Sequence, residues 1–117
     1  KEINKDFPEL ILCDHKGYII EGITSNIFFI KKKNFYTPII NESGVDGIMK
    51  SIIIKKLKQK KFKIFEKRIH KKDVNTYDAA FFCNSIRLVW NILSIDGYKY
   101  KDNEWLSYIM NIINNNE

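Results

Sequence analysis

EGITSNIFFI, residues 21–30, places a carboxylate, a glycine and three small polar residues before the apolar run IFFI. A short continuous apolar run bounded by turn residues predicts a buried strand. A charged side chain is costly to bury without partners. Glu21 is therefore either a turn residue that points into water or part of a polar site at the mouth of the core.

The composition predicts one globular domain over residues 1–117, because 44% of the residues are hydrophobic and 14% are aromatic. The net charge of +6 comes from lysines scattered along the chain, with no base-stacking motif among them. We therefore expect no nucleic-acid partner. A non-catalytic basic binding domain stays open as an alternative.

Cys13 and Cys83 each lie in an apolar, strand-like run, which predicts two buried free thiols and a cytoplasmic protein. No apolar run approaches the roughly 20 residues that cross a bilayer. We therefore expect no membrane partner.

Alternation and helical periodicity predict the elements. A hairpin turns at Gly17, and Asp96 with Gly97 forms the strongest short turn signal. Asp73 is expected to cap a short helical turn through Tyr77. The predicted strands are residues 9–14, 18–21, 26–30, 35–37, 62–69, 79–83, 88–95 and 98–101, and the predicted helices begin near residues 45 and 105.

Two further segments carry polar groups that suit an anion. In GVDGIMK, residues 44–50, Gly47 falls in the first turn of a predicted helix, where unpaired N–H groups favour a phosphate. In CNSIRLVW, residues 83–90, Asn84 and Ser85 follow the most apolar strand. Each segment alone is explained by an ordinary helix start or a self-capped loop. Together with Glu21 they predict an anion cup and a carboxylate that face one pocket.

Other polar residues are weaker candidates. His15 and His70 lie among lysines without metal-ligand spacing, so no metal site is expected. Asp73 and Asp78 bracket a short helix and are interpreted as caps. The serines lack the context of an activated nucleophile.

The order of EGITSNIFFI, YTP, GVDGIMK and DAAFFCNS followed by LVW resembles the C-terminal domain of the fold-type IV pyridoxal-phosphate enzymes, the class-IV aminotransferase superfamily. Within it, CNS followed by an apolar run with Trp90 looks most like the aminodeoxychorismate lyases. The resemblance implies an α/β (α+β) fold with a curved, largely antiparallel sheet and two main helices. It also implies pyridoxal 5'-phosphate as the cofactor.

The resemblance assigns roles where residues match. Glu21 matches the glutamate that pairs with the protonated ring nitrogen of the cofactor, and Asn26 matches the asparagine that helps to fix the ring. In the family, backbone amides at a helix start bind the phosphate, and a loop after a strand closes on the phosphate and substrate side. The residues that match these two features, and are therefore expected to bind the cofactor, are Gly47, Ile48, Met49, Asn84 and Ser85.

The resemblance also implies parts outside this sequence. The Schiff-base lysine would lie upstream of Lys1, as would a smaller N-terminal domain, so no catalytic residue is assigned here and the chain alone is expected to be inactive. The expected partners are a small-molecule substrate and a second copy in a homodimer.

The implied reaction converts 4-amino-4-deoxychorismate to 4-aminobenzoate and pyruvate for folate biosynthesis. Lys50 stands where the family usually has arginine, and Arg87, Leu88 and Asn91 depart from the family's substrate loop. A branched-chain or D-amino-acid aminotransferase of the same superfamily therefore stays open.

Overall fold

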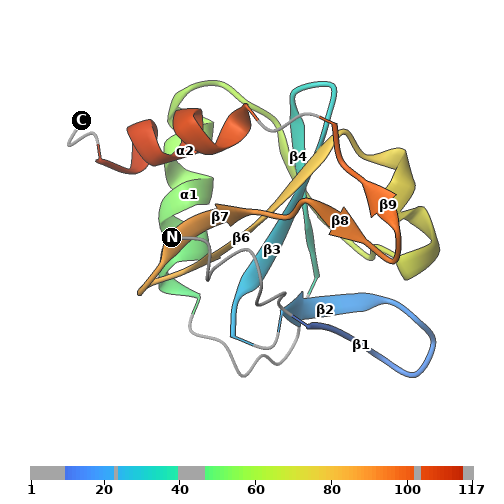
Figure 1. The fold of residues 1–117 in the computed structure, drawn as a ribbon. Helices are drawn as coiled ribbons and strands as arrows, with labels where there is room; N and C mark the ends of the chain where they lie inside the picture. Colours follow the sequence, from blue (N-terminus) through green and yellow to red (C-terminus); the bar gives the residue numbers. More distant parts are fainter. Residues whose placement is uncertain (1–9, 23, 40–46, 102–103, 115–117) are drawn as a thin grey trace.

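A computed structural model describes residues 10–22, 24–39, 47–101 and 104–114. Its centre is a five-stranded sheet with the spatial order β5-β4-β3-β6-β7, in which only β4 and β5 pair in parallel (Figure 1). The strands are β3 (Asn26–Lys31), β4 (Asn34–Pro38), β5 (Ile64–Lys67), β6 (Ala79–Asn84) and β7 (Leu88–Asn91). The expected α/β fold with a largely antiparallel sheet is confirmed.

The central pair, β3 and β6, is apolar because both of its faces are covered. Phe28 stacks on Phe81 with ring centroids 5.0 Å apart, on one face of the sheet. Ile27 and Phe29, which alternate with Phe28 along β3, belong to a second cluster on the other face. Successive residues along a strand point to opposite faces, so the continuous apolar run contributes side chains to both hydrophobic clusters.

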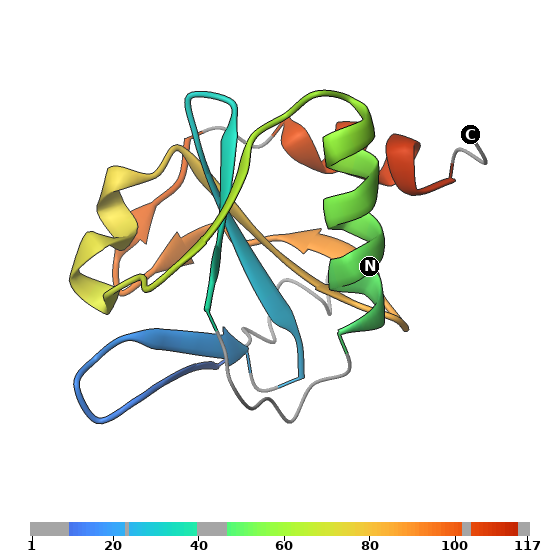
Figure 2. The same ribbon diagram turned by 180° about the vertical axis from the view of Figure 1, so that it is seen from behind.

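Two helices cover the first face. They are α1 (Ile48–Gln59) and α2 (Trp105–Asn114), and Figure 2 shows α1 running across the sheet. Met49, Ile53 and Leu57 of α1 are buried at helical spacing. They pack with Phe28 and Cys83 in one cluster, which fixes where α1 starts relative to the sheet.

Smaller elements cover the second face. These are the ribbon β1 (Ile11–Cys13) with β2 (Ile19–Gly22), the 3-10 helix η2 (Lys71–Thr76), and the ribbon β8 (Ser94–Ile95) with β9 (Tyr98–Lys99). Neither α1 nor α2 combines the length and apolar character that crossing a bilayer needs, and no other helix in the described ranges does.

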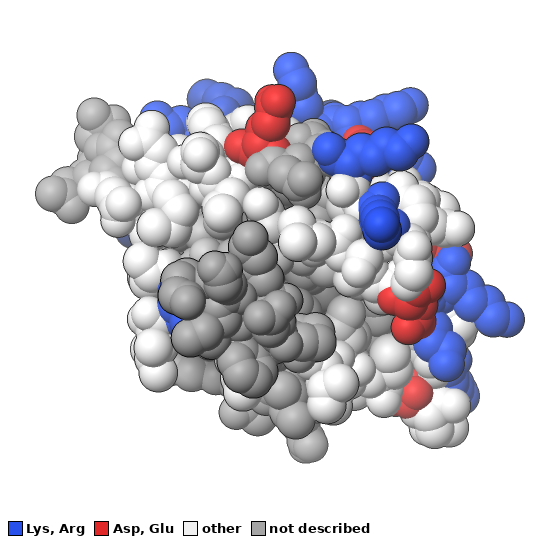
Figure 3. All heavy atoms as spheres, viewed as in Figure 1, with Lys and Arg blue, Asp and Glu red and all other residues white. Residues whose placement is uncertain are grey.

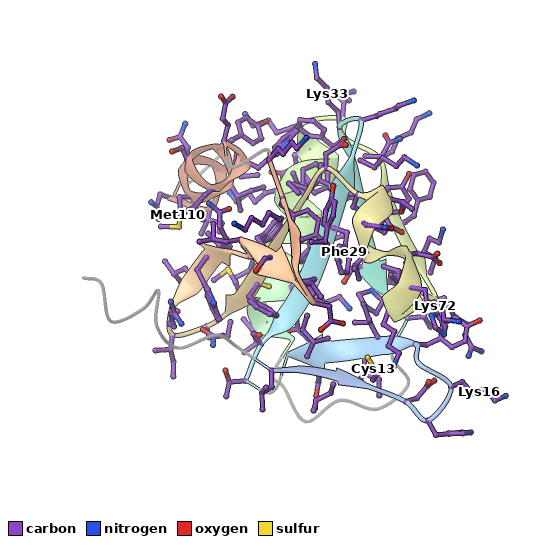
Figure 4. The ribbon with its side chains drawn as sticks, turned by 45° about the vertical axis from the view of Figure 1, so that its right-hand side comes forward. Cys13, Lys16, Phe29, Lys33, Lys72 and Met110 are labelled. Atoms are coloured by element: carbon purple, nitrogen blue, oxygen red, sulfur yellow. The ribbon has the colours of Figure 1, made fainter. Side chains whose placement is uncertain are left out.

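Three expectations from the sequence are corrected. Cys13 is exposed, because β1 pairs only with β2, outside the five-stranded sheet, and Figure 4 places it on that ribbon. His70, not Asp73, caps η2, because its Nδ1 accepts the N–H of Lys72. The strand predicted over residues 88–95 is two strands, β7 and β8, on different partners.

Asp78 is a cap of another kind, because its Oδ2 accepts the N–H of Lys32 at 2.8 Å. Lys32 and Lys33 form the turn between β3 and β4 with φ angles of 51° and 69°. Lys33 stands at the tip of that turn, at the opposite end of the molecule from Cys13 (Figure 4).

His70 joins the β1–β2 ribbon to η2. Its Nε2 lies 2.9 Å from the Lys16 carbonyl oxygen, and its ring meets Tyr18 edge-on with centroids 4.9 Å apart. Because Nδ1 accepts the Lys72 N–H, the proton belongs on Nε2, which donates to Lys16. Gly17 lies directly against this ring, and a Cβ there would be 2.7 Å from Nε2.

We predict that Gly17→Ala destabilises the protein more than Gly97→Ala. Both glycines have positive φ, 92° and 84°, but a Cβ at Gly97 meets nothing within 4 Å. The backbone strain costs about 1–2 kcal/mol at each site, and displacement of His70 adds a loss on the order of 1 kcal/mol at Gly17 only. Urea unfolding of both variants measures the difference, and equal losses would contradict the packing of His70 on Gly17.

Candidate functional site

A tight turn brings Glu21 and Asn26 to one place. The Gly22 N–H donates to the Ser25 carbonyl oxygen with an N–O distance of 2.8 Å, and the Ser25 N–H donates to the Gly22 carbonyl oxygen with an N–O distance of 3.5 Å. Glu21 is a buried residue of β2 just before this turn, and Asn26 begins β3 just after it. The turn therefore holds a carboxylate and a carboxamide at its two sides.

Both of these polar residues are buried. Glu21 is 4% exposed and Asn26 is 3% exposed, beside the fully buried Ser25. Carboxylates are rarely buried to this extent unless a positive charge or several donors face them. The alternative that Glu21 is a solvated turn residue is wrong.

Asn26 carries an unusual oxygen. Its Oδ1 is buried and has no hydrogen-bond partner among the described residues. A buried acceptor without a donor costs on the order of 1–3 kcal/mol. Such a group points to a polar ligand as its natural partner.

Asn84, the last residue of β6, connects a second segment to this turn. Its Nδ2 donates to the carbonyl oxygen of Thr24 at 3.0 Å, and Thr24 lies between Glu21 and Asn26 in the sequence. Its Oδ1 accepts the N–H groups of Ile86 and Arg87 at 3.1 and 2.7 Å. The side chain thus caps its own loop and also binds the neighbouring loop.

The start of α1 lies beside the end of β6. Cys83 pairs with Asn26 across the sheet and shares a cluster with Met49. Burial raises the pKa of the Cys83 thiol to about 12, and the ammonium of Lys50 acts in the opposite direction. Figures 1 and 2 both place the starts of β3 and α1 and the end of β6 at the same end of the molecule.

Gly47 precedes α1 without a side-chain cap. Its φ of −92° and ψ of 14° suit any residue, but a Cβ there would meet no described atom within 4 Å. The backbone of a helix start is thus open to approach, and helix starts attract anions. The side chains of Ile48 and Met49 behave differently, since Ile48 is 58% exposed and Met49 is buried in the core.

The structure therefore gathers the three predicted segments. Residues 44–46 of GVDGIMK lie outside the described residues. Ser85 is exposed in the turn after Asn84.

Sequence reasoning missed two features. The Thr24 carbonyl is a partner of Asn84, and no short-range pattern could reveal a bond across 60 residues. The second feature is the contact between Arg87 and Trp90, whose guanidinium and ring centroid lie 4.0 Å apart. The short spacing of these two residues, in a turn and the strand that follows it, could have indicated this contact.

The rest of the surface offers weaker candidates. In the view of Figure 3, Lys and Arg side chains gather along the top and the right-hand side, with Asp and Glu among them. A hollow of about 510 Å³ lies on the outer side of α1, away from the candidate residues. The hollow is lined by Ser51, Ile54, Lys55, Lys58 and Gln59. Within the described ranges, no group of three or more His, Cys, Asp or Glu side chains is arranged to hold a metal.

Comparison with known proteins gives one family. The model of the family described as amino-transferase class IV matches residues 2–95. The branched-chain-amino-acid aminotransferase of Pseudomonas aeruginosa is 36% identical over 91 residues, which are 78% of this chain and 29% of that protein. That of Salmonella typhimurium is 29% identical over 91 residues, again 78% and 29%. The chain thus spans less than a third of the length of these curated relatives.

Solved structures share the fold. An aminotransferase from Brucella abortus bound to the cofactor PLP has a TM-score of 0.81 at 23% identity, covering 94% of this chain and 39% of that one. The 4-amino-4-deoxychorismate lyase from Pseudomonas aeruginosa has a TM-score of 0.81 at 18% identity, covering 92% and 42%. The family uses pyridoxal 5'-phosphate, as the sequence resemblance implied.

We predict that Asn26→Leu leaves the stability of the cofactor-free protein within about 0.5 kcal/mol of wild type or raises it, because it removes an acceptor that has no donor among the described residues. Thr37→Val is the matched control, since the Thr37 hydroxyl donates to the Ile27 carbonyl at 2.8 Å in the core. It should cost about 1 kcal/mol. Urea unfolding checks both, and a loss of about 2 kcal/mol for Asn26→Leu would contradict the orphaned oxygen.

Proposed function

This chain belongs to the amino-transferase class IV family, and we propose that it is the cofactor-binding part of a pyridoxal-phosphate-dependent enzyme. The observation that carries the proposal is the burial of Glu21, 4% exposed, at a turn that also buries Asn26. A carboxylate in a partly dry site suits a cationic heterocycle. The nearby start of α1 suits a phosphate.

Glu21 and Asn26 suit the ring of pyridoxal phosphate. Bound pyridoxal phosphate supplies an electron sink for bonds at the carbon that carries the substrate's amino group. The carboxylate of Glu21 would hold a proton on the ring nitrogen, because an anion in a site of low dielectric favours the protonated form. The buried Oδ1 of Asn26 would accept a hydrogen bond at the ring.

The phosphate would lie at the start of α1. The backbone amides of Ile48 and Met49 would donate to it, and the open space beside Gly47 leaves the helix start accessible. Ser85 would approach from the turn after β6. Met49 suits this role because its side chain packs into the core and fixes its amide.

The rest of the enzyme is also part of the proposal. The lysine that bonds to the cofactor and the domain that covers its other side would lie outside these residues, in keeping with the short span of the relatives that this chain covers. The whole protein would act as a homodimer in the cytoplasm on a small-molecule substrate. Membership in an enzyme family and the buried Glu21 argue against the non-catalytic basic domain.

Two reactions are candidates for the whole enzyme. The curated relatives at 36% and 29% identity are named branched-chain-amino-acid aminotransferases, and they favour transfer of the amino group of leucine, isoleucine or valine. The lyase reaction that converts 4-amino-4-deoxychorismate to 4-aminobenzoate and pyruvate is the second candidate. The stretch of residues 83–90, CNSIRLVW, favours it by resemblance.

One assay of the full-length protein separates the two. We predict that the protein, loaded with pyridoxal phosphate, forms glutamate from 2-oxoglutarate in the presence of leucine, isoleucine or valine. Release of pyruvate from 4-amino-4-deoxychorismate without glutamate formation would instead establish the lyase. A protein that binds no pyridoxal phosphate would contradict both.

We predict that Glu21→Gln lowers turnover on the order of a hundredfold or more, comparable to the loss of one well-placed electrostatic contact. Glutamine keeps the size and hydrogen bonding of Glu21 but removes the charge that would hold the ring proton. The variant should fold normally and retain the cofactor through the phosphate. Steady-state turnover and the visible spectrum check this, and unchanged turnover with an unchanged spectrum would remove Glu21 from the site.

A further inference from the structure

Asn84 makes three hydrogen bonds within the protein, through its carboxamide oxygen and one N–H of its nitrogen. Its Oδ1 accepts two backbone N–H groups, from Ile86 and Arg87, and its Nδ2 donates to the Thr24 carbonyl. We propose that Asn84 is a positioning residue, which fixes the Glu21–Asn26 turn against the loop after β6 before any ligand arrives. This inference rests on the proposed function, and it differs from a direct contact between Asn84 and the cofactor.

The hydrogen bond from Asn84 to Thr24 can position the Glu21–Asn26 turn because Thr24 lies within that turn. Thr24 lies inside the turn closed by Gly22 and Ser25, so it is held only three residues from Glu21 and two from Asn26. β3 and β6 pair no further than Asn26 with Cys83. Beyond that pair, the hydrogen bond from the Asn84 side chain to the Thr24 carbonyl continues the connection between the two loops.

The chemistry requires a carboxamide. Asparagine offers one acceptor oxygen with two lone pairs and one donor nitrogen on a short side chain. Aspartate would keep the acceptor for Ile86 and Arg87 but would set an oxygen against the Thr24 carbonyl. Alanine would lose all three bonds. The two substitutions therefore separate the capping of the loop from the connection to Thr24.

The capped loop presents the groups that follow Asn84. Ser85 lies between Asn84 and the two amides that Asn84 binds. The Arg87 guanidinium rests over Trp90 at 4.0 Å from the ring centroid. Fixing this loop against the Glu21–Asn26 turn sets the distance between the proposed ring site and the proposed phosphate site.

Hydrogen–deuterium exchange of the cofactor-free full-length protein tests the proposal. In Asn84→Ala, amides of residues 22–26 should exchange roughly threefold to tenfold faster than in wild type, the range for loss of one net hydrogen bond, and residues 85–87, which lose two hydrogen bonds, should accelerate at least as much. In Asn84→Asp, residues 22–26 should exchange as fast as in Asn84→Ala, while residues 85–87 stay protected. Asn75→Ala and Asn75→Asp, in the exposed end of η2, are the matched controls and should change neither segment.

Cofactor affinity gives the second readout. Asn84→Ala should weaken binding of pyridoxal phosphate roughly threefold or more, as the two loops lose their fixed spacing. Weaker binding with unchanged exchange at residues 22–26 would overturn the proposal in favour of direct contact. Unchanged exchange and unchanged affinity would also overturn it. If wild type binds no pyridoxal phosphate, the proposed function fails, and faster exchange at residues 22–26 in both variants would still establish the connection through Asn84.

Discussion

Burial of the Glu21 carboxylate is the constraint that organises this structure. A carboxylate that is 4% exposed must be held by a precise arrangement of its surroundings. The turn closed by Gly22 and Ser25 provides it, because it ties Glu21 to the first residue of the central strand β3. The polar site is thereby built into the start of the core instead of lying on a separate loop.

The two apolar faces of the sheet make that arrangement rigid. On one face, Met49, Ile53 and Leu57 anchor α1, so the start of the helix is fixed beside the end of β6. On the other face, the β1–β2 ribbon is tied to η2 through His70. Asn26 and Asn84 lie at the ends of apolar, buried stretches, which are residues 27–30 of β3 and residues 79–83 of β6.

Local patterns in the sequence predicted the features that depend on near neighbours. The alternation of Phe28 with Phe29 and the helical spacing of Met49, Ile53 and Leu57 predicted the sheet and α1. Cys13 was wrongly expected to be buried, because the same apolar run suits a strand in a central sheet or in an outer ribbon. Periodicity reports the strand and does not report what covers it.

Contacts between distant residues could not be predicted in this way. Joint spacing of three motifs indicated that Glu21, Gly47 and Asn84 belong to one site, but not how they are connected. The bond from Asn84 to Thr24 spans 60 residues, and the cap of η2 by His70 also depends on the ribbon that packs against it. The orphaned Oδ1 of Asn26 became visible only once its surroundings were known.

The central claim is that buried Glu21 serves a cationic ring nitrogen. The most direct measurement is the nitrogen-15 NMR shift of ring-labelled pyridoxal phosphate bound to the full-length protein at neutral pH. We expect the shift of a protonated pyridine nitrogen, retained at pH values well above those at which the free cofactor loses this proton, because the adjacent carboxylate favours the charged form. The shift of an unprotonated nitrogen in the bound cofactor would contradict it.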